Sequence, residues 1–268
     1  MRIRAGYVIS YDLPAPTPML LMLNVRPERA RDLETPDDIR TDPHTNVRRY
    51  ADAYGNVCSR LLAPAGRFTL SSDFIIGDTG LSDPSVPDAG QHAIDDLPDE
   101  VIEYLLPSRY CDVELLNDLA WQLFAGTPEG WARVQAIVAY AHQRISFGYE
   151  HARATKTASQ AHEEGYGVCR DYAHLAITLC RCMNIPARYC TGYLGDIGIL
   201  PSDTPMDFSA WFQAWLGGAW RTFDARHNRP RIGRIQMAVG RDATDVAITT
   251  TFGTAVLAGF EVLTEELP

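Results

Sequence analysis

The sequence predicts an α+β fold in two parts: an antiparallel β-sandwich-like domain over residues 1–95 and an α+β domain over residues 96–268. The prediction rests on the spacing of apolar residues. They alternate in the first part, recur about every 3.6 residues in the middle of the chain, and alternate again after Pro186. A segment rich in Gly, Pro, Asp and Ser, residues 77–99, separates the first two regions. Helices followed by strands within one region are typical of α+β domains.

Strands are predicted through most of the first part. Apolar and other residues alternate from Arg2 to Ile9, which indicates a first strand. Further strand-like segments follow at residues 19–25, 47–53, 57–63 and 68–76. Turn residues at positions 54–56 and 64–66 separate the last three segments. We therefore expect an antiparallel meander that folds into a sandwich.

Three helices are predicted in the second part, each with an apolar face. The first has Leu115, Leu116, Leu119, Ala120 and Leu123 on that face. The second begins at Thr127-Pro128, an N-cap followed by a proline at the first helical position, and faces inward with Trp131, Val134, Ile137, Val138 and Ala141. The third runs from near Val168 to Asn184-Ile185-Pro186, with an inward face of Tyr172, Leu175, Ala176, Leu179 and Met183. Strands are expected afterwards at residues 187–193, 210–216, 220–224, 246–250 and 254–263.

The composition indicates a folded chain with an acidic surface. Its 268 residues are 46% hydrophobic and 22% charged, enough to bury a sizeable core. The formal net charge of -10 repels phosphate backbones and anionic bilayers, so we expect neither a nucleic-acid nor a membrane partner. No apolar stretch reaches the roughly 18 residues of a spanning helix, and residues 1–15 alternate where a signal peptide would have an apolar block. The expected location is the cytoplasm.

Six cysteines are too few for a small domain held together by disulfides, so a cysteine with a special role should be chemical rather than structural. Cys180, Cys182 and Cys190 lie within eleven residues, but their spacing matches no standard zinc pattern. We expect these three to be buried, inert thiols. The sequence therefore predicts no metal site.

Cys169 lies in the segment with the sharpest local pattern, Gly165-Tyr166-Gly167-Val168-Cys169-Arg170-Asp171-Tyr172, a glycine-bracketed start of a helix. Unpaired N–H groups at a helix start favour an anion, so this position favours the thiolate form of the cysteine. The same N–H groups can stabilise a developing oxyanion, and Gly167 would let a substrate backbone approach. From this segment alone, a reactive cysteine and a buried small apolar residue are equally compatible.

Together with the residues that follow, this segment resembles the transglutaminase-like superfamily of papain-related cysteine enzymes, in its bacterial type with a β-rich N-terminal domain. The resemblance spans roughly residues 130–228. It rests on Gly167-Val168-Cys169, Ile185-Pro186-Ala187-Arg188, Gly192-Tyr193, Ser209-Ala210-Trp211 and Trp220-Arg221-Thr222-Phe223-Asp224. The fold it implies for the second part is a papain-like α+β domain with the cysteine helix packed on an antiparallel sheet.

The resemblance also implies the roles of individual residues. Cys169 would attack a carboxamide carbonyl and Asp224 would orient the base, but Ser209 occupies the position of the family's histidine. A serine hydroxyl has no useful affinity for a proton near neutral pH. Gly167 and Trp211 are the expected substrate-binding residues. No cofactor is implied, since the thiol is the reagent, and the calcium used by some animal relatives has no matching acidic loop here.

Three explanations of Ser209 remain open. In the first explanation the chain is an inactive form of a cysteine hydrolase, since losing the base of a triad lowers the rate by roughly 10⁴ to 10⁶. Alternatively, His227 substitutes as the base; otherwise it is a surface loop residue. In the third explanation no imidazole is needed, because a thiol with a pKa of about 8.5 already supplies some thiolate.

The other polar candidates have a structural interpretation. His174 lies about 140° around the helix from Cys169 at 100° per residue, so it should not face the nucleophile. Arg226, Arg229, Arg231 and Arg234 could bind an acidic group, although a solvated basic loop is the simpler interpretation. Trp211, Trp215 and Trp220 fit core packing, with Trp211 nearest the cleft.

The sequence therefore predicts a transglutaminase-like cysteine hydrolase or acyltransferase. It would act on an amide or peptide bond of a peptide, protein or small amide through a Cys169 thioester, and Ser209 would impair it. The alternative is a catalytically silent binding or scaffold protein that keeps the cleft.

Overall fold

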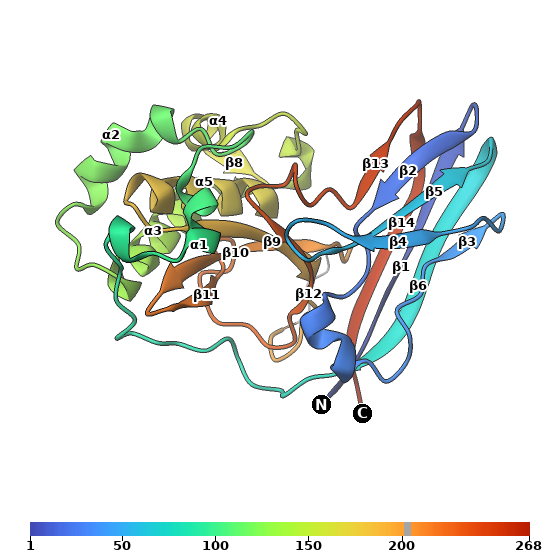
Figure 1. Cartoon of the computed structure of the whole chain (residues 1–268), viewed down its shortest axis with the longest axis horizontal. Helices are drawn as coiled ribbons and strands as arrows, with labels where there is room; N and C mark the ends of the chain where they lie inside the picture. Colours follow the sequence, from blue (N-terminus) through green and yellow to red (C-terminus); the bar gives the residue numbers. More distant parts are fainter. Residues whose placement is uncertain (201–204) are drawn as a thin grey trace.

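The computed structural model describes residues 1–200 and 205–268, and it confirms the predicted α+β class. Two units lie beside each other in Figure 1. A β-sandwich is on the right, and helices pack on a separate four-stranded antiparallel sheet on the left. The chain runs from the sandwich into the helical unit and returns to the sandwich at its C-terminal end.

Two four-stranded antiparallel sheets form the sandwich. The first has the strands β14 (Val256–Leu267), β1 (Arg2–Leu13), β6 (Gly66–Gly77) and β3 (Arg40–Asp42), in that order. The second has β13 (Thr249–Thr251), β2 (Thr17–Leu21), β5 (Val57–Ala63) and β4 (Arg48–Ala51). Alternate side chains such as Ile3, Ala5 and Phe74 are buried, because successive side chains of a strand point to opposite faces. The period of two thus predicted the main strands of this unit.

The last two strands of the chain lie in the sandwich. β14 pairs with β1 from Arg2 opposite Leu267 to Asp12 opposite Val256, and β13 pairs with β2. Their alternation predicted strands at 246–250 and 254–263 but placed them in the unit that begins at residue 96. The difference arises because alternation shows which face of a strand is buried and not which strand lies beside it. Without β14, the long strand β1 would leave its backbone groups unpaired along one edge.

The second unit has a sheet on one side and helices on the other. Its sheet has the strands β11 (Ala219–Phe223), β10 (Ser209–Leu216), β9 (Ala187–Tyr193) and β12 (Ile235–Gly240), in that order. The long helices are α2 (Val113–Phe124), α3 (Trp131–Arg144) and α5 (Cys169–Cys182). Shorter elements are α1 (Asp99–Ile102), α4 (Ala158–Glu164), β7 (Ser146–Phe147), β8 (Tyr166–Gly167) and the 3₁₀ helices η2 (Ile94–Asp96), η3 (Glu103–Leu105) and η4 (Tyr149–His151). A further 3₁₀ helix, η1 (Pro27–Asp32), lies between β2 and β3 in the chain. The three expected helices are present, whereas β12 and α4 were not predicted.

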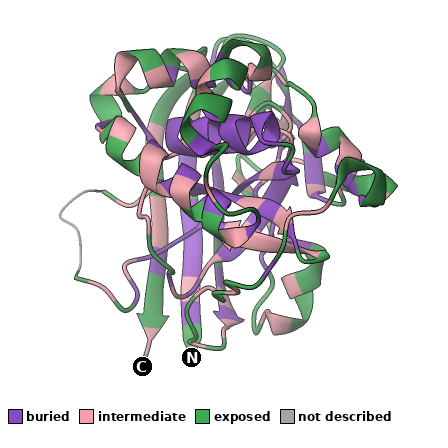
Figure 2. Cartoon of the chain, turned by 90° about the vertical axis from the view of Figure 1, so that its left-hand side faces the viewer, coloured by how far each residue is buried: buried purple, intermediate pink, exposed green. Residues whose placement is uncertain are grey.

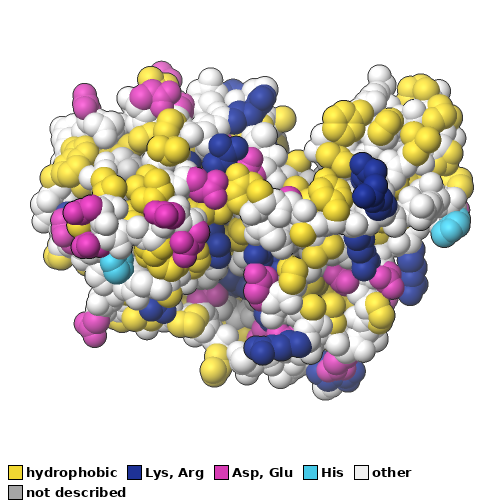
Figure 3. Space-filling view, viewed as in Figure 1, with side chains coloured by type: hydrophobic (Ala, Val, Ile, Leu, Met, Phe, Trp, Pro, Cys, Tyr) yellow, Lys and Arg dark blue, Asp and Glu magenta, His cyan; other side chains and the backbone are white. Residues whose placement is uncertain are grey.

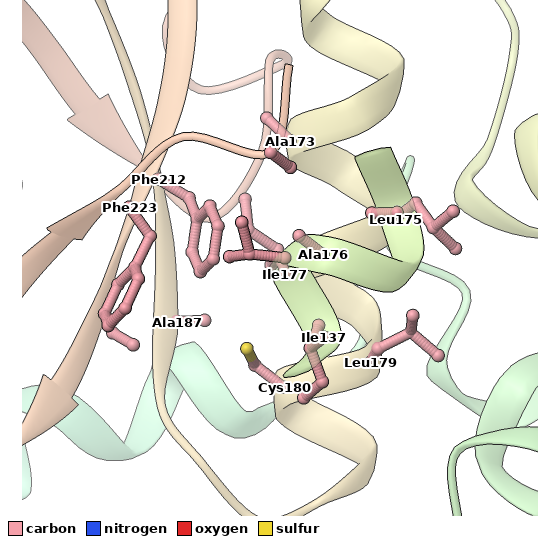
Figure 4. Close-up of a cluster of buried hydrophobic side chains, with 14 of the residues drawn as sticks. Ile137, Ala173, Leu175, Ala176, Ile177, Leu179, Cys180, Ala187, Phe212 and Phe223 are labelled. Carbon is pink, nitrogen blue, oxygen red and sulfur yellow. The ribbon is translucent and has the colours of Figure 1, made fainter. Parts of the chain in front are cut away.

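The helix α5 is the centre of this unit and is buried along almost its whole length (Figure 2). In Figure 4, Ile177 and Cys180 face the sheet residues Phe212 and Ala187, while Leu179 points to the opposite side. Every residue from Asp171 to Cys182 is buried, including the polar His174 and Arg181, so neighbouring elements enclose this helix on all sides. The sheet and the surrounding helices therefore hold both ends of α5 in place, including the end that begins with Cys169.

Two helix predictions need correction. Leu115 and Leu123 are 66% and 39% exposed, so the buried face of α2 is narrower than the sequence indicated. The helix α3 begins at Trp131, not at Thr127-Pro128, and its N-cap is Gly130 with φ 83°. A side chain at Gly130 would collide with the Ala89 carbonyl oxygen, 2.4 Å from the ideal Cβ position. Packing against the preceding segment sets this start, which no local capping signal reveals.

Residues 77–99 form an ordered strap across the second unit. Asp83 N donates to the Arg231 carbonyl, Trp131 N donates to the Ala89 carbonyl, and Gly217 N donates to the Gly90 carbonyl. The strap therefore brings the Asp83 side chain to the edge of the candidate site.

The surface carries charges of both signs. Basic, acidic and apolar side chains are interspersed on the face shown in Figure 3. Some of the opposite charges pair between neighbouring strands, as Arg4 does with Asp73 at 2.9 Å. Among the described residues, none of the helices combines the length and the apolar character that spanning a bilayer requires.

His174 gives the fold a pH dependence. It is fully buried on α5, where its Nε2 accepts a hydrogen bond from Ala243 N at 3.1 Å. Burial lowers the pKa of His174 to about 3, against the opposing effect of Asp242, and Arg170 and Arg181 lower it further. The unfolded chain, with a His pKa of about 6.5, binds a proton that the folded chain does not, so stability falls as the pH drops below 6.5.

We therefore expect the wild-type chain to lose about 2 kcal/mol of unfolding free energy through His174 between pH 7 and pH 5. Urea unfolding at both pH values measures the loss. In His174→Gln, which cannot titrate, the loss should be smaller by that amount. Equal losses in both proteins would contradict this assignment.

Candidate functional site

The start of α5 fixes the position of Cys169, its first residue. Asp171 Oδ2 accepts a hydrogen bond from Val168 N at 2.9 Å and so caps the helix. Gly167 makes room for this cap, because a Cβ there would lie 2.5 Å from Asp171 Oδ2. Gly167 is buried, so what the structure shows for it is a structural role at this helix start, and its contact with substrate stays a prediction.

Cys169 opens into a cavity of about 380 Å³. The opposite wall comes from the start of β10 and the residues before it, including Asp207 and Ser209, while Arg153 and Arg170 line the helix side. The sequence placed the sulfur at a helix start facing Ser209, and the structure places both residues in the walls of one cavity.

The protonation of Cys169 differs from the expectation. Burial raises the pKa of the thiol to about 11 and Asp207 adds to the rise, while Arg226 and backbone hydrogen bonds from Ala210 and Arg170 lower it. The effect of desolvation exceeds that of the helix start, so the thiol form dominates near neutral pH. Burial thus opposes the thiolate form that the helix start favours.

Ser209 is the first residue of β10 and pairs with Gly192 of β9. It also lines a second, smaller cavity of about 100 Å³, whose walls include His227, Arg226 and Asp207. The two cavities share Asp207 and Ser209. Ser209 thus stands between the space in front of the sulfur and the space in front of His227.

Asp224 directly follows β11, the strand beside β10. Its carboxylate accepts hydrogen bonds from His227 N at 2.9 Å, from His227 Nδ1 at 2.9 Å and from Arg234 Nη2 at 2.9 Å. Burial raises the pKa of Asp224, but Arg234 and His227 outweigh it and hold the pKa below its usual range. Asp224 is therefore ionised, and its two hydrogen bonds orient His227. The sequence had left His227 as either a substitute base or a surface loop residue.

The arginines after β11 are not a solvated basic loop. Arg234 is 8% exposed and joins two carboxylates, with Nε 2.8 Å from Asp83 Oδ2 and Nη2 2.9 Å from Asp224 Oδ2. The Arg231 side chain is 1% exposed. Arg226 lines the smaller cavity, and only Arg229 is exposed. These side chains turn inward because buried carboxylates and carbonyls offer them acceptors, which sequence spacing does not reveal.

Trp211 does not line the cleft as predicted. It is 1% exposed and packs with Cys190 and Val239 beneath the Arg234 guanidinium, whose carbon lies 4.9 Å from the ring centre. Trp211 and Ser209 are two residues apart on one strand, so their side chains point to the same side of the sheet. The Arg234 guanidinium nevertheless covers the Trp211 ring and separates it from the cleft. Trp211 therefore supports Arg234 instead of a substrate.

The other cysteines behave as expected of interior thiols. Cys180, Cys182 and Cys190 are buried, and burial raises the pKa values of Cys182 and Cys190 to about 12. In the described ranges, no group of three or more His, Cys, Asp or Glu side chains could hold a metal ion.

Sequence reasoning missed two groups of the site, Asp207 in the walls of both cavities and Tyr149 in those of the smaller one. Both line cavities of the site, and burial raises the pKa values of both. Asp207 is two residues before Ser209, and that proximity was the one available signal. Asp83 is farther away in sequence and carried no signal.

Comparison with known proteins bears on this arrangement. A family model described as the transglutaminase-like superfamily matches residues 117–225. An uncharacterised protein of Mycobacterium leprae (strain TN) is 29% identical over 218 residues, which are 78% of this chain and 77% of that protein. A crystal structure of a proposed cysteine protease from Cytophaga hutchinsonii superposes with a TM-score of 0.86 at 28% identity, covering 100% of this chain and 91% of that one.

The matched residues contain α5 with Cys169, the strands β9 to β11 and Asp224. The structural likeness extends over the β-sandwich as well. This chain has a transglutaminase-like fold with a β-rich N-terminal part.

Proposed function

We propose that the chain acts as a transglutaminase-like cysteine hydrolase or acyltransferase through a Cys169 thioester, and that Ser209 makes it slow on ordinary amides. The single observation that carries the proposal is that Cys169 and Ser209 line the same cavity, with the sulfur at the start of α5. A nucleophile thus faces the space where a base would act.

The reaction shows where the impairment arises. The Cys169 sulfur would bond to the carbonyl carbon, the carbon–nitrogen bond would break, and water or an amine would then release the acyl group. The thiol must lose its proton and the departing nitrogen must gain one. With the pKa of Cys169 raised to about 11 by burial, the site depends on a base, and the Ser209 hydroxyl cannot act as one.

Among the three explanations, the geometry favours impairment. His227 donates its Nδ1 proton to Asp224 and lines the smaller cavity, while the cavity in front of Cys169 has Ser209 in its wall and not His227. A raised thiol pKa also opposes the explanation that needs no imidazole. The substrate class remains a peptide, protein or small amide.

A silent binding protein is the second candidate function. The observation that favours it is the arrangement around Asp224, whose carboxylate already orients His227, a residue that is not in the described walls of the Cys169 cavity. For either function we propose the cytoplasm, because all six cysteines are free thiols and thiols persist in reducing compartments.

An activated ester tests whether Cys169 still forms a thioester. The leaving group of p-nitrophenyl acetate departs without a proton, so the missing base matters only for ionising the thiol. We expect acetylation of Cys169, seen by mass spectrometry of the digested protein. Its rate should rise about tenfold per pH unit from pH 7 toward the pKa of the thiol, because the thiolate is the nucleophile.

Cys58 offers a matched control. Its side chain is buried in the sandwich, far from α5 in the chain, and burial raises its pKa to about 11, as for Cys169. Cys58→Ala should leave the release of nitrophenolate unchanged, whereas Cys169→Ala should abolish its fast phase. Absence of an acetyl group on Cys169 in the wild-type protein would refute the proposed thioester and leave the silent binding protein.

A further inference from the structure

The small cavity beside Ser209 has unused hydrogen-bond donors. Its volume is about 100 Å³, and its walls include Tyr149, Ser209, Arg226, His227 and Arg231. Within the described ranges, the Ser209 and Tyr149 hydroxyls and His227 Nε2 have no hydrogen-bond partner in the protein. A ligand for such walls must offer acceptors.

Arg226 supplies the largest group of free donors. Its guanidinium lies over the Phe147 ring, 3.8 Å from the ring centre, which fixes its plane. Among residues 1–200 and 205–268 it forms no hydrogen bond or ion pair through this group, although the chain has 34 acidic residues. A guanidinium presents five N–H donors in a fixed fork that matches a carboxylate.

Arg231 supplies a second, buried donor. Its side chain is 1% exposed, and Nη2 donates to the Gly195 carbonyl at 2.8 Å while Asp196 Oδ1 lies 3.8 Å away. Arg231 Nε is buried and has no hydrogen-bond partner in the described chain. Because a buried N–H without a partner costs stability, a ligand that accepts from it gains that energy on binding.

We infer that this cavity binds the C-terminal carboxylate of a peptide, held by Arg226 with Arg231 and the Ser209 hydroxyl. The anion would fill the space that an imidazole at position 209 would otherwise occupy. Binding does not require the thiol, so the inference stands independently of the proposed thioester.

Asp207 makes a peptide a better match than a simple anion. Its carboxyl lies in the same walls, and no ion pair joins it to Arg226 among the described residues. The last peptide bond of a chain carries an N–H close to the terminal carboxylate, and Asp207 can accept from it. Because Asp207 and Ser209 also line the cavity of Cys169, this pose directs the preceding peptide bond toward the sulfur.

Calorimetric titration at pH 7 tests the inference with two probes: N-acetyl-Ala-Ala with a free carboxylate and the same peptide as its C-terminal amide. The Cys169→Ala protein prevents turnover, so the result does not depend on catalysis. We expect the acid to bind at least about tenfold more tightly than the amide, as for hydrogen bonds to a charged group. Equal affinities would overturn the inference.

Variants identify the residues that carry the preference. Arg226→Gln should weaken binding of the acid about tenfold and leave the affinity for the amide unchanged. The affinity of Arg226→Lys for the acid should lie between those of the wild type and Arg226→Gln, because lysine keeps the charge but lacks the forked donors. The matched control is Arg229→Gln, an exposed arginine three residues away that lines a different cavity. An unchanged acid preference in folded Arg226→Gln, or inorganic phosphate displacing the acid at lower concentration than acetate does, would reject the assignment.

Discussion

Ser209→His should raise the rate of amide cleavage by about 10²- to 10⁴-fold, the contribution of a positioned base. The substitution places an imidazole at the first residue of β10, in a wall shared by the cavity of Cys169 and the smaller cavity of about 100 Å³. Among residues 1–200 and 205–268, the one donor to Asp224 Oδ1 is His227 N, so this oxygen retains a lone pair for the new ring. Hydrolysis of a blocked peptide amide, which carries no carboxylate, measures the gain.

Two controls separate this gain from other causes. Ser209→Ala removes the hydroxyl without adding a base and should leave the rate unchanged. The double variant Ser209→His, Cys169→Ala should be inactive because it lacks the nucleophile. If neither Ser209→His nor the same change combined with His227→Gln gains activity, while circular dichroism shows the fold intact, the proposed base position is rejected.

Asp224→Ala should lower the unfolding free energy by about 3–5 kcal/mol, since it leaves a buried cation without its partner. The Arg234 guanidinium, 8% exposed, would keep Asp83 but lose the second carboxylate, and His227 would lose both its hydrogen bonds to Asp224. Urea unfolding at pH 7 measures the change. Asp73→Ala, which breaks an exposed pair with Arg4, should cause little loss because solvent screens such pairs.

The pH dependence of this loss has a definite sign. The folded pKa of Asp224 lies below the unfolded value of about 3.9, so its stabilising effect is complete above that pH and declines on acidification. The difference between wild type and Asp224→Ala should stay constant from about pH 8 to pH 5 and narrow below about pH 4. A loss no larger than that of Asp73→Ala would contradict the structural role assigned to Asp224 and Arg234.

Local patterns predicted the elements that hold the site. The alternation in β9 and the helical spacing of α5 gave both elements to within one or two residues, because each buries its apolar face against its neighbours. The glycine-bracketed segment located Cys169 at the start of its helix. Such features depend on residues that are close together in the chain.

Contacts between distant residues were not predictable in the same way. The pairing of β14 with β1 joins opposite ends of the chain, and the start of α3 at Trp131 depends on the carbonyl of Ala89. Trp211 was predicted to line the cleft because it is two residues from Ser209 in the sequence, but Arg234 covers its ring. Which strands pair and which side chain covers a ring depend on the surfaces that meet in the folded chain. The spacing of residues along one strand carries no information about those surfaces.

The sequence by itself determined the α+β class, the sulfur at the start of a helix and the serine at the position of the base, because side-chain chemistry and local periodicity are properties of the chain. Only the tertiary structure decided that burial raises the pKa of this sulfur, that Asp224 holds His227 and Arg234, and that the Arg226 guanidinium lines a cavity without a hydrogen-bond partner among the described residues. The physical reason is that desolvation and charge pairing act through space. Their strength depends on the groups that folding brings within a few ångströms of each other.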